Sequence, residues 1–359
     1  MTEPGPETPA GPEAPAEPAD PGQTAGSSLP PETVSARAWA PALGLFRFTI
    51  EGRRAPGLFV AGWLSTVVGA ILAFVGLLAG PSFAGAVLFV VGLAVLFGGL
   101  LLLGGSQVVE RGAAGLAYAG PSPILVFGAT IVGLYLAVVV VGTPLQILDI
   151  EVEGPALALL GVAIQAVVAI GILRLLVVGP GGLSWSEMGL RASAPAALRE
   201  LAYGAVFALP VIVVTAIAVY ALVTLIGSAP ESPLPPAGTS VGLAINLLAG
   251  AVIAPFYEEL LFRGFALTAW ARVVTPAAAI VRTSVLFALA HNVGQGGDSF
   301  GQAFGLVLVA TAGRLPVALV LGWVFVRRRS LWASVGLHAA FNAILLVIAE
   351  SALENLPAG

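Results

Sequence analysis

The stretch AGAVLFVVGLAVLFGGLLLLG, residues 84–104, holds no charged or strongly polar side chain. A helix needs about 20 apolar residues to cross the hydrocarbon core of a bilayer, because each residue advances it by about 1.5 Å. The run is continuous and does not alternate with polar residues, so it favours a spanning helix and excludes the strands of a transmembrane barrel. An all-α fold within a membrane is therefore predicted.

Similar runs recur along the whole chain. The 359 residues are 58% hydrophobic and 9% charged, whereas soluble domains carry roughly 25% charged residues. The fold class predicted is a polytopic transmembrane helical bundle of about nine spanning helices. The predicted helices are 57–79, 84–104, 123–142, 155–178, 201–226, 240–271, 276–295, 302–326 and 331–349.

Composition divides the chain into four parts. Residues 1–42 contain ten Pro and six acidic residues, which predicts a disordered cytoplasmic tail, because such a segment cannot bury a core. Residues 43–239 are expected to form a scaffold of about five helices. Residues 240–350 form a second group of about four helices, and 351–359 are a C-terminal tail.

Basic residues separate from acidic ones across the predicted membrane. The positive-inside rule therefore places the N-terminus in the cytoplasm and the C-terminus outside. The predicted loops on the other side of the membrane hold only acidic charges. The Arg residues of the tail and of the cytoplasmic loops are Arg37, Arg47, Arg53, Arg54, Arg111, Arg191, Arg199, Arg272, Arg327, Arg328 and Arg329.

The last four predicted helices carry polar groups inside apolar runs. An ionisable side chain at a helix centre costs on the order of 2.5–3.5 kcal/mol on insertion scales, so such a residue is read first as functional. Arg282 and Arg314 also lie in these runs, but no function is assigned to them. The candidates are Glu258, Glu259, Arg263, His291, His338 and Asn342.

Helical spacing predicts different neighbours for Glu258 and Glu259. Glu259 and Arg263 are four residues apart and can form an ion pair on one helix face. Glu258 is rotated by about 100° from Glu259, so it points elsewhere and stays without a cationic partner. A buried carboxylate of this kind is a candidate general base.

The predicted depths place polar side chains of three helices at the same level of the membrane. At about 1.5 Å per residue, Glu258, His291, His338 and Asn342 all fall in the middle of a core about 30 Å thick. Structural alternatives stay open for each residue taken alone. Glu259 and Arg263 can be a clamp, each His a packed residue, and Asn342 a contact between helices. The chain has only two His, and both lie at this level.

The motifs resemble those of a known family. EELLFR (258–263), FALAH (287–291) and HAAFN (338–342) resemble the EExxxR, FxxxH and HxxxN motifs of the CPBP intramembrane proteases. That group includes CAAX prenyl endopeptidases and bacteriocin-processing or immunity (Abi) proteins. LSWSEMGLR (183–191) is similar to a segment that often precedes the core. The resemblance covers residues 240–350.

The resemblance implies hydrolysis of a peptide bond in or near an inner membrane. It makes Glu258 the residue that activates water, with His291 sharing its proton and Glu259 and Arg263 in support. His338 and Asn342 would stabilise the oxyanion. The substrate expected is a peptide or a membrane-anchored protein, and the partners are lipid and protein but not nucleic acid.

Two questions remain open at this level. Glu258, His291 and His338 could hold a catalytic zinc ion, yet a mechanism by glutamate alone uses the same residues. The chain has no Cys, so thiolate zinc sites and cysteine nucleophiles are excluded. The alternative function is a catalytically silent membrane protein that acts in immunity or regulates a partner; a transporter fits less well, since the first half lacks polar groups.

Overall fold

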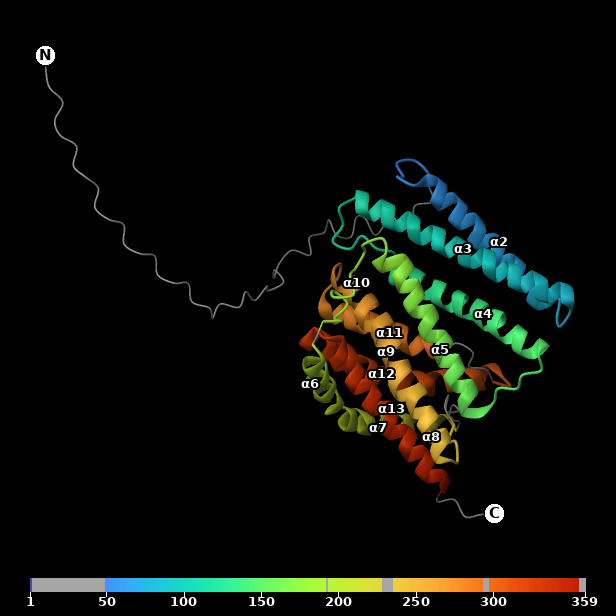
Figure 1. Cartoon of the computed structure of the whole chain (residues 1–359), viewed down its shortest axis with the longest axis vertical. Helices are drawn as coiled ribbons and strands as arrows, with labels where there is room; N and C mark the ends of the chain where they lie inside the picture. The colour runs from blue at the N-terminus through green and yellow to red at the C-terminus, as the bar shows by residue number, and fades with distance from the viewer. Residues whose placement is uncertain (2–48, 192, 228–234, 293–296, 355–359) are drawn as a thin grey trace. The chain divides into compact units, whose positions relative to one another are not determined.

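The computed structural model describes Met1 and residues 49–191, 193–227, 235–292 and 297–354. All regular elements in these ranges are helices (Figure 1). The predicted tail 1–42, apart from Met1, lies outside the described residues, and so do 355–359 of the predicted C-terminal tail.

Eight helical segments in the described residues are long and apolar enough to cross a bilayer, which confirms a polytopic helical bundle. Several of these segments contain more than one element. Five are single helices: α2 (Pro56–Leu78), α3 (Phe83–Ala113), α4 (Pro123–Ile147), α12 (Phe300–Arg328) and α13 (Leu331–Glu354). Two combine a pair of elements: α5 (Gly154–Ile172) with η2 (Leu173–Val178), and α6 (Ala194–Ala205) with α7 (Ala208–Ile226). The eighth joins five elements: α8 (Ser240–Leu247), η3 (Leu248–Ile253), α9 (Ala254–Glu259), η4 (Leu260–Leu267) and α10 (Thr268–Ala271).

The seventh predicted span is shorter than expected. It was predicted over 276–295, but α11 covers Pro276–Ala290, which is 15 residues. At about 1.5 Å per residue, α11 is about 22 Å long and does not match the core thickness by itself. His291 caps the helix with φ −80° and ψ −3°, and the sequence that follows it is rich in Gly and polar residues. His291 therefore sits at the end of a helix.

Glycines allow α2 and α3 to lie against each other along their length (Figure 1). Gly69 and Gly76 on α2, and Gly92 and Gly99 on α3, are each seven residues apart, so each pair lies on one helix face. A Cβ atom added to any of them would meet backbone atoms of the partner helix. Small residues let helices approach in lipid, where no hydrophobic force drives them together.

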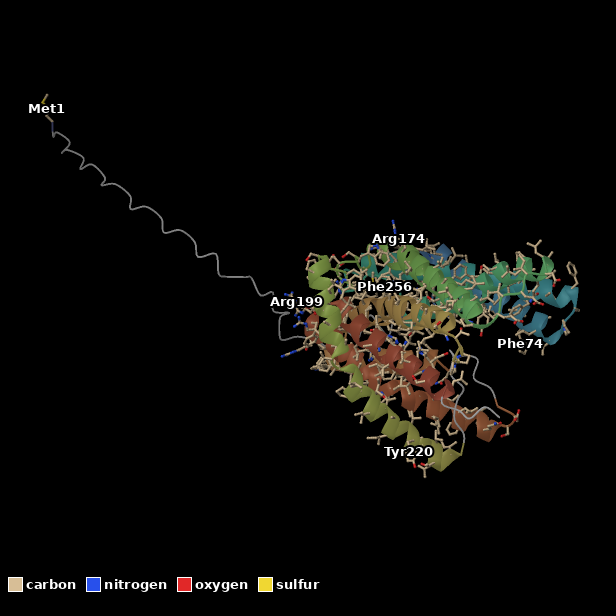
Figure 2. All side chains as sticks on the ribbon, turned by 60° about the horizontal axis from the view of Figure 1, so that its bottom comes forward. Met1, Phe74, Arg174, Arg199, Tyr220 and Phe256 are labelled. Atoms are coloured by element: carbon tan, nitrogen blue, oxygen red, sulfur yellow. The ribbon has the colours of Figure 1, made fainter. Side chains whose placement is uncertain are left out.

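Aromatic and aliphatic side chains cover the outer faces of the bundle. Phe74 on α2 is 61% exposed and Tyr220 on α7 is 72% exposed, and both point away from the neighbouring helices in Figure 2. Such exposure is expected where the surrounding medium is hydrocarbon and not water. The faces that are buried most are those of the 240–271 segment and α13.

The segment 240–271 is a continuous helix with two π-helical stretches, η3 and η4. Pro255 accounts for the first, because its ring clashes with the carbonyl four residues earlier and it has no N–H to donate. The wider π turn moves that carbonyl away. Ala254 N–H bonds accordingly to Ala249 O, five residues back. Wide turns of this kind often occur at functional sites.

The loop 183–191 anchors the 240–350 group at the side predicted to be cytoplasmic. Met188 and Leu183 are buried, and Leu331 N–H donates to Gly189 O at 3.1 Å. Bonds from the Ser184 backbone N–H and hydroxyl, with a smaller effect of Arg272, hold the pKa of Glu187 at about 2. The carboxylate therefore stays ionised and keeps its 2.6 Å ion pair with Arg272 until the pH falls toward that value.

The glycine contact between α2 and α3 yields a prediction. Gly92→Ala places a methyl group against the backbone of Ala73, and overpacking of this kind typically costs about 1–3 kcal/mol. We expect the apparent unfolding temperature in detergent to fall. Gly98→Ala on the same helix is the matched control, because nothing lies within 4 Å of its added Cβ. Equal unfolding temperatures for the two variants would contradict the close packing.

Candidate functional site

The Glu259 carboxylate is an ion buried in the centre of the bundle. Its side chain and that of Arg263 are both 0% exposed. Glu259 Oε1 accepts from Arg263 Nη1 at 2.9 Å and lies 2.8 Å from His338 Nδ1. Arg263 Nη2 donates to Ala318 O of α12 at 3.1 Å. The ion pair predicted from the spacing is confirmed, and it also connects η4 with α12 and α13.

Each imidazole has one nitrogen held by an acceptor. His338 Nδ1 faces the Glu259 carboxylate, and His291 Nδ1 lies 2.8 Å from Phe287 O. Carboxylates and carbonyls accept hydrogen bonds, so both Nδ1 atoms must carry the proton. In the neutral ring the lone pair is then on Nε2. The tautomers thus follow from the neighbours of Nδ1.

The Glu258 carboxylate faces both of these Nε2 atoms. Glu258 Oε2 lies 3.6 Å from His291 Nε2 and 3.9 Å from His338 Nε2. These separations are too long for direct hydrogen bonds. Glu258 Oε2 is buried and has no hydrogen-bond partner among the described protein atoms. Three electron-pair donors from α9, α11 and α13 therefore converge on one point, as the depth argument predicted for these three residues.

Phe287 packs against both imidazole rings. Its ring is 2% exposed and lies 4.4 Å from the His291 ring and 5.8 Å from the His338 ring, centroid to centroid. The guanidinium carbon of Arg263 lies 4.5 Å from the centroid of Phe287, a favourable cation–π distance. Phe287 thereby fixes the orientation of both His side chains.

Asn342 has a different contact from the other three residues at this depth. Its Nδ2 donates to Gly250 O at 2.7 Å. Gly250 lies in η3, where Ala254 N–H bonds to Ala249 O, and the next residue, Pro255, has no N–H. The π turn thus leaves the Gly250 carbonyl without its regular donor, and Asn342 supplies one. This contact is of the structural kind left open by the sequence, and the oxyanion role remains a prediction.

Two residues at the site were missed by the sequence interpretation. Tyr257 OH lies 2.6 Å from Gln165 Oε1 on α5 and 3.3 Å from Glu258 Oε1. Gln165 is the only uncharged polar side chain between 155 and 178, and that isolation was the available signal.

Arg314 on α12 bonds to Ala310 O and interacts electrostatically with Glu258, while Arg282 is exposed.

The donor set around Glu258 has the chemistry that zinc prefers, namely two imidazole nitrogens and a carboxylate oxygen. The Nδ1 bonds of His291 and His338 are also of the kind that orients metal-binding imidazoles. Within the described ranges, however, no three His, Asp or Glu side chains are grouped closely enough to form a ready metal site. The predicted zinc set of Glu258, His291 and His338 therefore stays a prediction.

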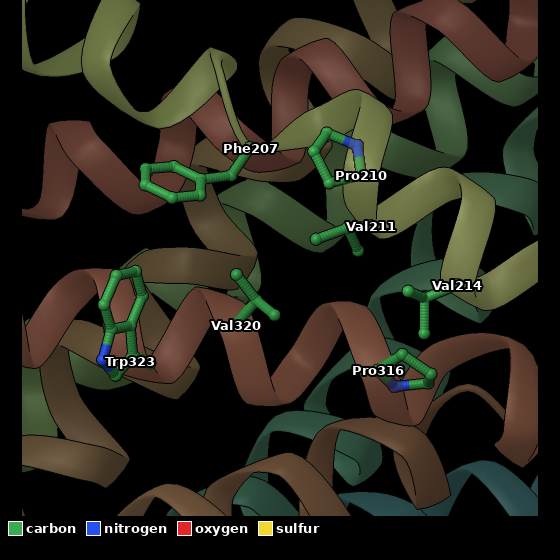
Figure 3. A pocket seen from close by; sticks show the side chains of 7 residues that line it. All are labelled: Phe207, Pro210, Val211, Val214, Pro316, Val320 and Trp323. Atoms are coloured by element: carbon green, nitrogen blue, oxygen red, sulfur yellow. The ribbon is translucent and has the colours of Figure 1, made fainter.

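An apolar cleft of about 330 Å³ lies between α7 and α12 (Figure 3). Its lining has no titratable side chain, so acid–base chemistry cannot take place there. The lining residues are Phe207, Pro210, Val211, Val214, Pro316, Val320 and Trp323.

The buried ion pair yields a prediction about stability. Arg263→Met leaves the Glu259 charge with a single partner, and breaking a buried pair typically costs about 3–5 kcal/mol. We expect a marked fall in the yield of folded protein and in unfolding temperature. Arg272→Met removes the partly exposed partner of Glu187, which is worth at most about 1 kcal/mol. If the two variants unfold at the same temperature, the buried pair does not have the role given to it here.

Comparison with known proteins adds one match. Residues 240–344 match the family described as Rce1-like, type II CAAX prenyl endopeptidase. No curated protein and no solved structure matches the chain. The matched residues include both glutamates of the EELLFR motif, both His and Asn342, and the match agrees with the resemblance seen in the motifs. Over residues 240–344, the chain is therefore similar to the Rce1-like type II CAAX prenyl endopeptidase family.

Proposed function

We propose that this protein is an intramembrane endopeptidase that hydrolyses a peptide bond by means of a water molecule activated by Glu258. The observation that carries the proposal is the convergence of Glu258 Oε2 with the Nε2 atoms of His291 and His338 at 3.6 and 3.9 Å. The match of residues 240–344 to a family of CAAX proteases supports hydrolysis as the reaction class.

The three acceptors suit a single water molecule. Water has two hydrogens, and it can donate one to Glu258 Oε2 and the other to His291 Nε2. Its oxygen lone pair is then directed away from the protein groups, toward the carbonyl carbon of a bound peptide. As the oxygen attacks, Glu258 takes the proton and later gives it to the leaving amine. The C–N bond breaks, and the water supplies the new carboxylate oxygen.

His338 has a separate role in the proposal. Glu259 Oε1 occupies His338 Nδ1, so Nε2 is the nitrogen left to face Glu258, and in a doubly protonated ring Nε2 is a donor. In that form it can donate to the oxyanion, an interaction whose loss typically costs about 3–4 kcal/mol. The second N–H of Asn342 is the other donor proposed, while its first holds Gly250 O.

The substrate class proposed is a peptide or a membrane-anchored protein that reaches the site from the cytoplasmic half. The protein would lie in the inner membrane with its N-terminus in the cytoplasm, as the distribution of Arg residues predicts. The position of Glu258 within a membrane-spanning segment supports a bond that is cleaved in or near the bilayer.

Glu258→Gln tests the base directly. The amide cannot accept the proton of water, so we expect hydrolysis of a membrane peptide library to fall at least about a hundredfold. Glu151→Gln, in an exposed loop, is the matched control and should keep activity. Glu258→Gln should also retain bound substrate for identification by mass spectrometry. An immunity or partner-binding phenotype that survives this change would instead favour the catalytically silent alternative.

Metal removal separates the two mechanisms. A water molecule held by Glu258, His291 and His338 alone predicts full activity after exhaustive chelation, with metal content checked by elemental analysis. When bound, a zinc ion would supply a water molecule of lowered pKa. Activity that is lost on chelation and restored by Zn²⁺ would assign these three side chains as ligands and would overturn the mechanism by glutamate alone.

A further inference from the structure

The cleft between α7 and α12 follows the two helices lengthwise. On α12, Pro316, Val320 and Trp323 are spaced by four and three residues, so they share one helix face. On the opposite wall, Phe207 caps α7 and Val214 follows seven residues later. Figure 3 shows Phe207 and Trp323 at one end of the cleft. Val214 and Pro316 are at the other end, about 10 Å away at the rise of a helix.

The medium around this cleft is hydrocarbon, because α7 and α12 belong to segments that are long and apolar enough to cross a bilayer. The purely apolar lining offers water no hydrogen-bond partner, and an empty space would forfeit dispersion contacts. A hydrocarbon chain is therefore the occupant that suits the cleft. All hydrocarbon chains are similarly apolar, so the choice of molecule depends on polar groups at the ends of the cleft.

One end of the cleft continues into charged side chains through a series of ring contacts. The Phe207 ring lies 5.6 Å from the Trp323 ring and 5.4 Å from the Tyr203 ring, centroid to centroid. The guanidinium carbon of Arg328 lies 4.4 Å from the Tyr203 centroid, and Arg328 forms an ion pair with Glu200 of α6. The Phe207 end of the cleft therefore meets the charged ends of α6 and α12.

Three more Arg side chains lie at this charged end. Arg327 follows Trp323 by four residues, so it lies on the cleft face of α12, about 6 Å further along the helix. Arg329 caps α12. Arg199 is on α6, at the end of the α6–α7 segment opposite to Tyr220 (Figure 2). The three Arg side chains are exposed, and none forms an ion pair with a described acidic side chain.

We propose that this surface binds an anionic phospholipid, with an acyl chain in the cleft and the phosphate headgroup on Arg199, Arg327 and Arg329. Guanidinium groups bind phosphate through two parallel hydrogen bonds. Basic pockets between membrane helices bind anionic headgroups in this way. The inference is independent of the proposed function, because no residue of the cleft or of the three Arg belongs to the site around Glu258.

Trp323 makes the site observable. Bromine atoms on an acyl chain quench the fluorescence of a tryptophan that they contact, and the difference between the protein and Trp323→Phe isolates the signal of Trp323. The full chain is reconstituted in phosphatidylcholine vesicles with an increasing share of phosphatidylglycerol, and either lipid carries the bromine. We expect phosphatidylglycerol to quench Trp323 at a smaller share of the lipid than phosphatidylcholine does, because only the former has a net negative charge.

The Arg side chains should set this preference. Arg199→Gln, Arg327→Gln and Arg329→Gln are each expected to lower it about fivefold, the size typical of one Arg near anionic lipid. Arg327→Lys should keep most of the preference, because the charge remains. Arg54→Gln, before α2, and Arg174→Gln, in η2, are the matched controls. Both side chains are exposed, and their loss should leave the preference unchanged.

A second set of variants tests the acyl chain. Val320→Phe fills the middle of the cleft and should weaken the quenching of Trp323 by brominated phosphatidylglycerol. Leu319→Phe adds a ring at an exposed neighbouring position outside the lining, and it should leave the quenching unchanged. If Val320→Phe and Leu319→Phe are quenched alike, no acyl chain lies in the cleft and the inference fails.

The remaining outcomes are equally decisive. Equal quenching by the two lipids, or a preference that survives the loss of all three Arg, overturns the inference. If neither brominated lipid quenches Trp323, a second copy of this chain covers the cleft, which also overturns it. Loss of hydrolysis in Glu258→Gln concerns the proposed function alone, because the lipid measurement requires no activity.

Discussion

The rest of the site depends on one buried carboxylate, that of Glu259. A carboxylate with no exposure to solvent or lipid must be paired, since removing one partner of a buried pair typically costs about 3–5 kcal/mol. Glu259 Oε1 takes both partners, Arg263 from its own helix and His338 from α13. This single oxygen therefore joins α13 to the 240–271 segment and sets which nitrogen of His338 carries the proton. The lone pair of that ring is turned toward Glu258 as a result.

Departures from regular helix geometry support the same arrangement. Pro255 precedes Glu258 by three residues, and the π turn that accommodates it leaves the Gly250 carbonyl to be bonded by Asn342. The end of α11 at Ala290 places His291 in a capping position, where its Nδ1 lies against Phe287 O. Each irregularity leaves a backbone group to be satisfied, and a side chain of the site satisfies it. Local geometry and side-chain orientation are thus coupled.

The neighbouring glutamates receive different environments although they are adjacent in sequence. Glu259 is enclosed by a cation and an imidazole, whereas Glu258 meets two imidazole lone pairs and a tyrosine hydroxyl that is drawn toward Gln165. Adjacent residues on a helix point about 100° apart, so the pair can serve two purposes. One carboxylate is enclosed in the buried ion pair, and the other faces the Nε2 atoms of His291 and His338.

The sequence by itself determined the membrane class, most spanning segments, the ion pair of Glu259 with Arg263 and the common depth of Glu258, His291 and His338. These follow from apolar length, charge burial and helical spacing, which are local properties of the chain. The sequence did not predict the short α11, the contact of Asn342 with Gly250 or the contact of Tyr257 with Gln165. Each of the last two contacts joins residues that are 92 positions apart. Only the packing of whole helices brings such residues within hydrogen-bonding distance, so the tertiary structure alone decided which atom of each side chain faces Glu258.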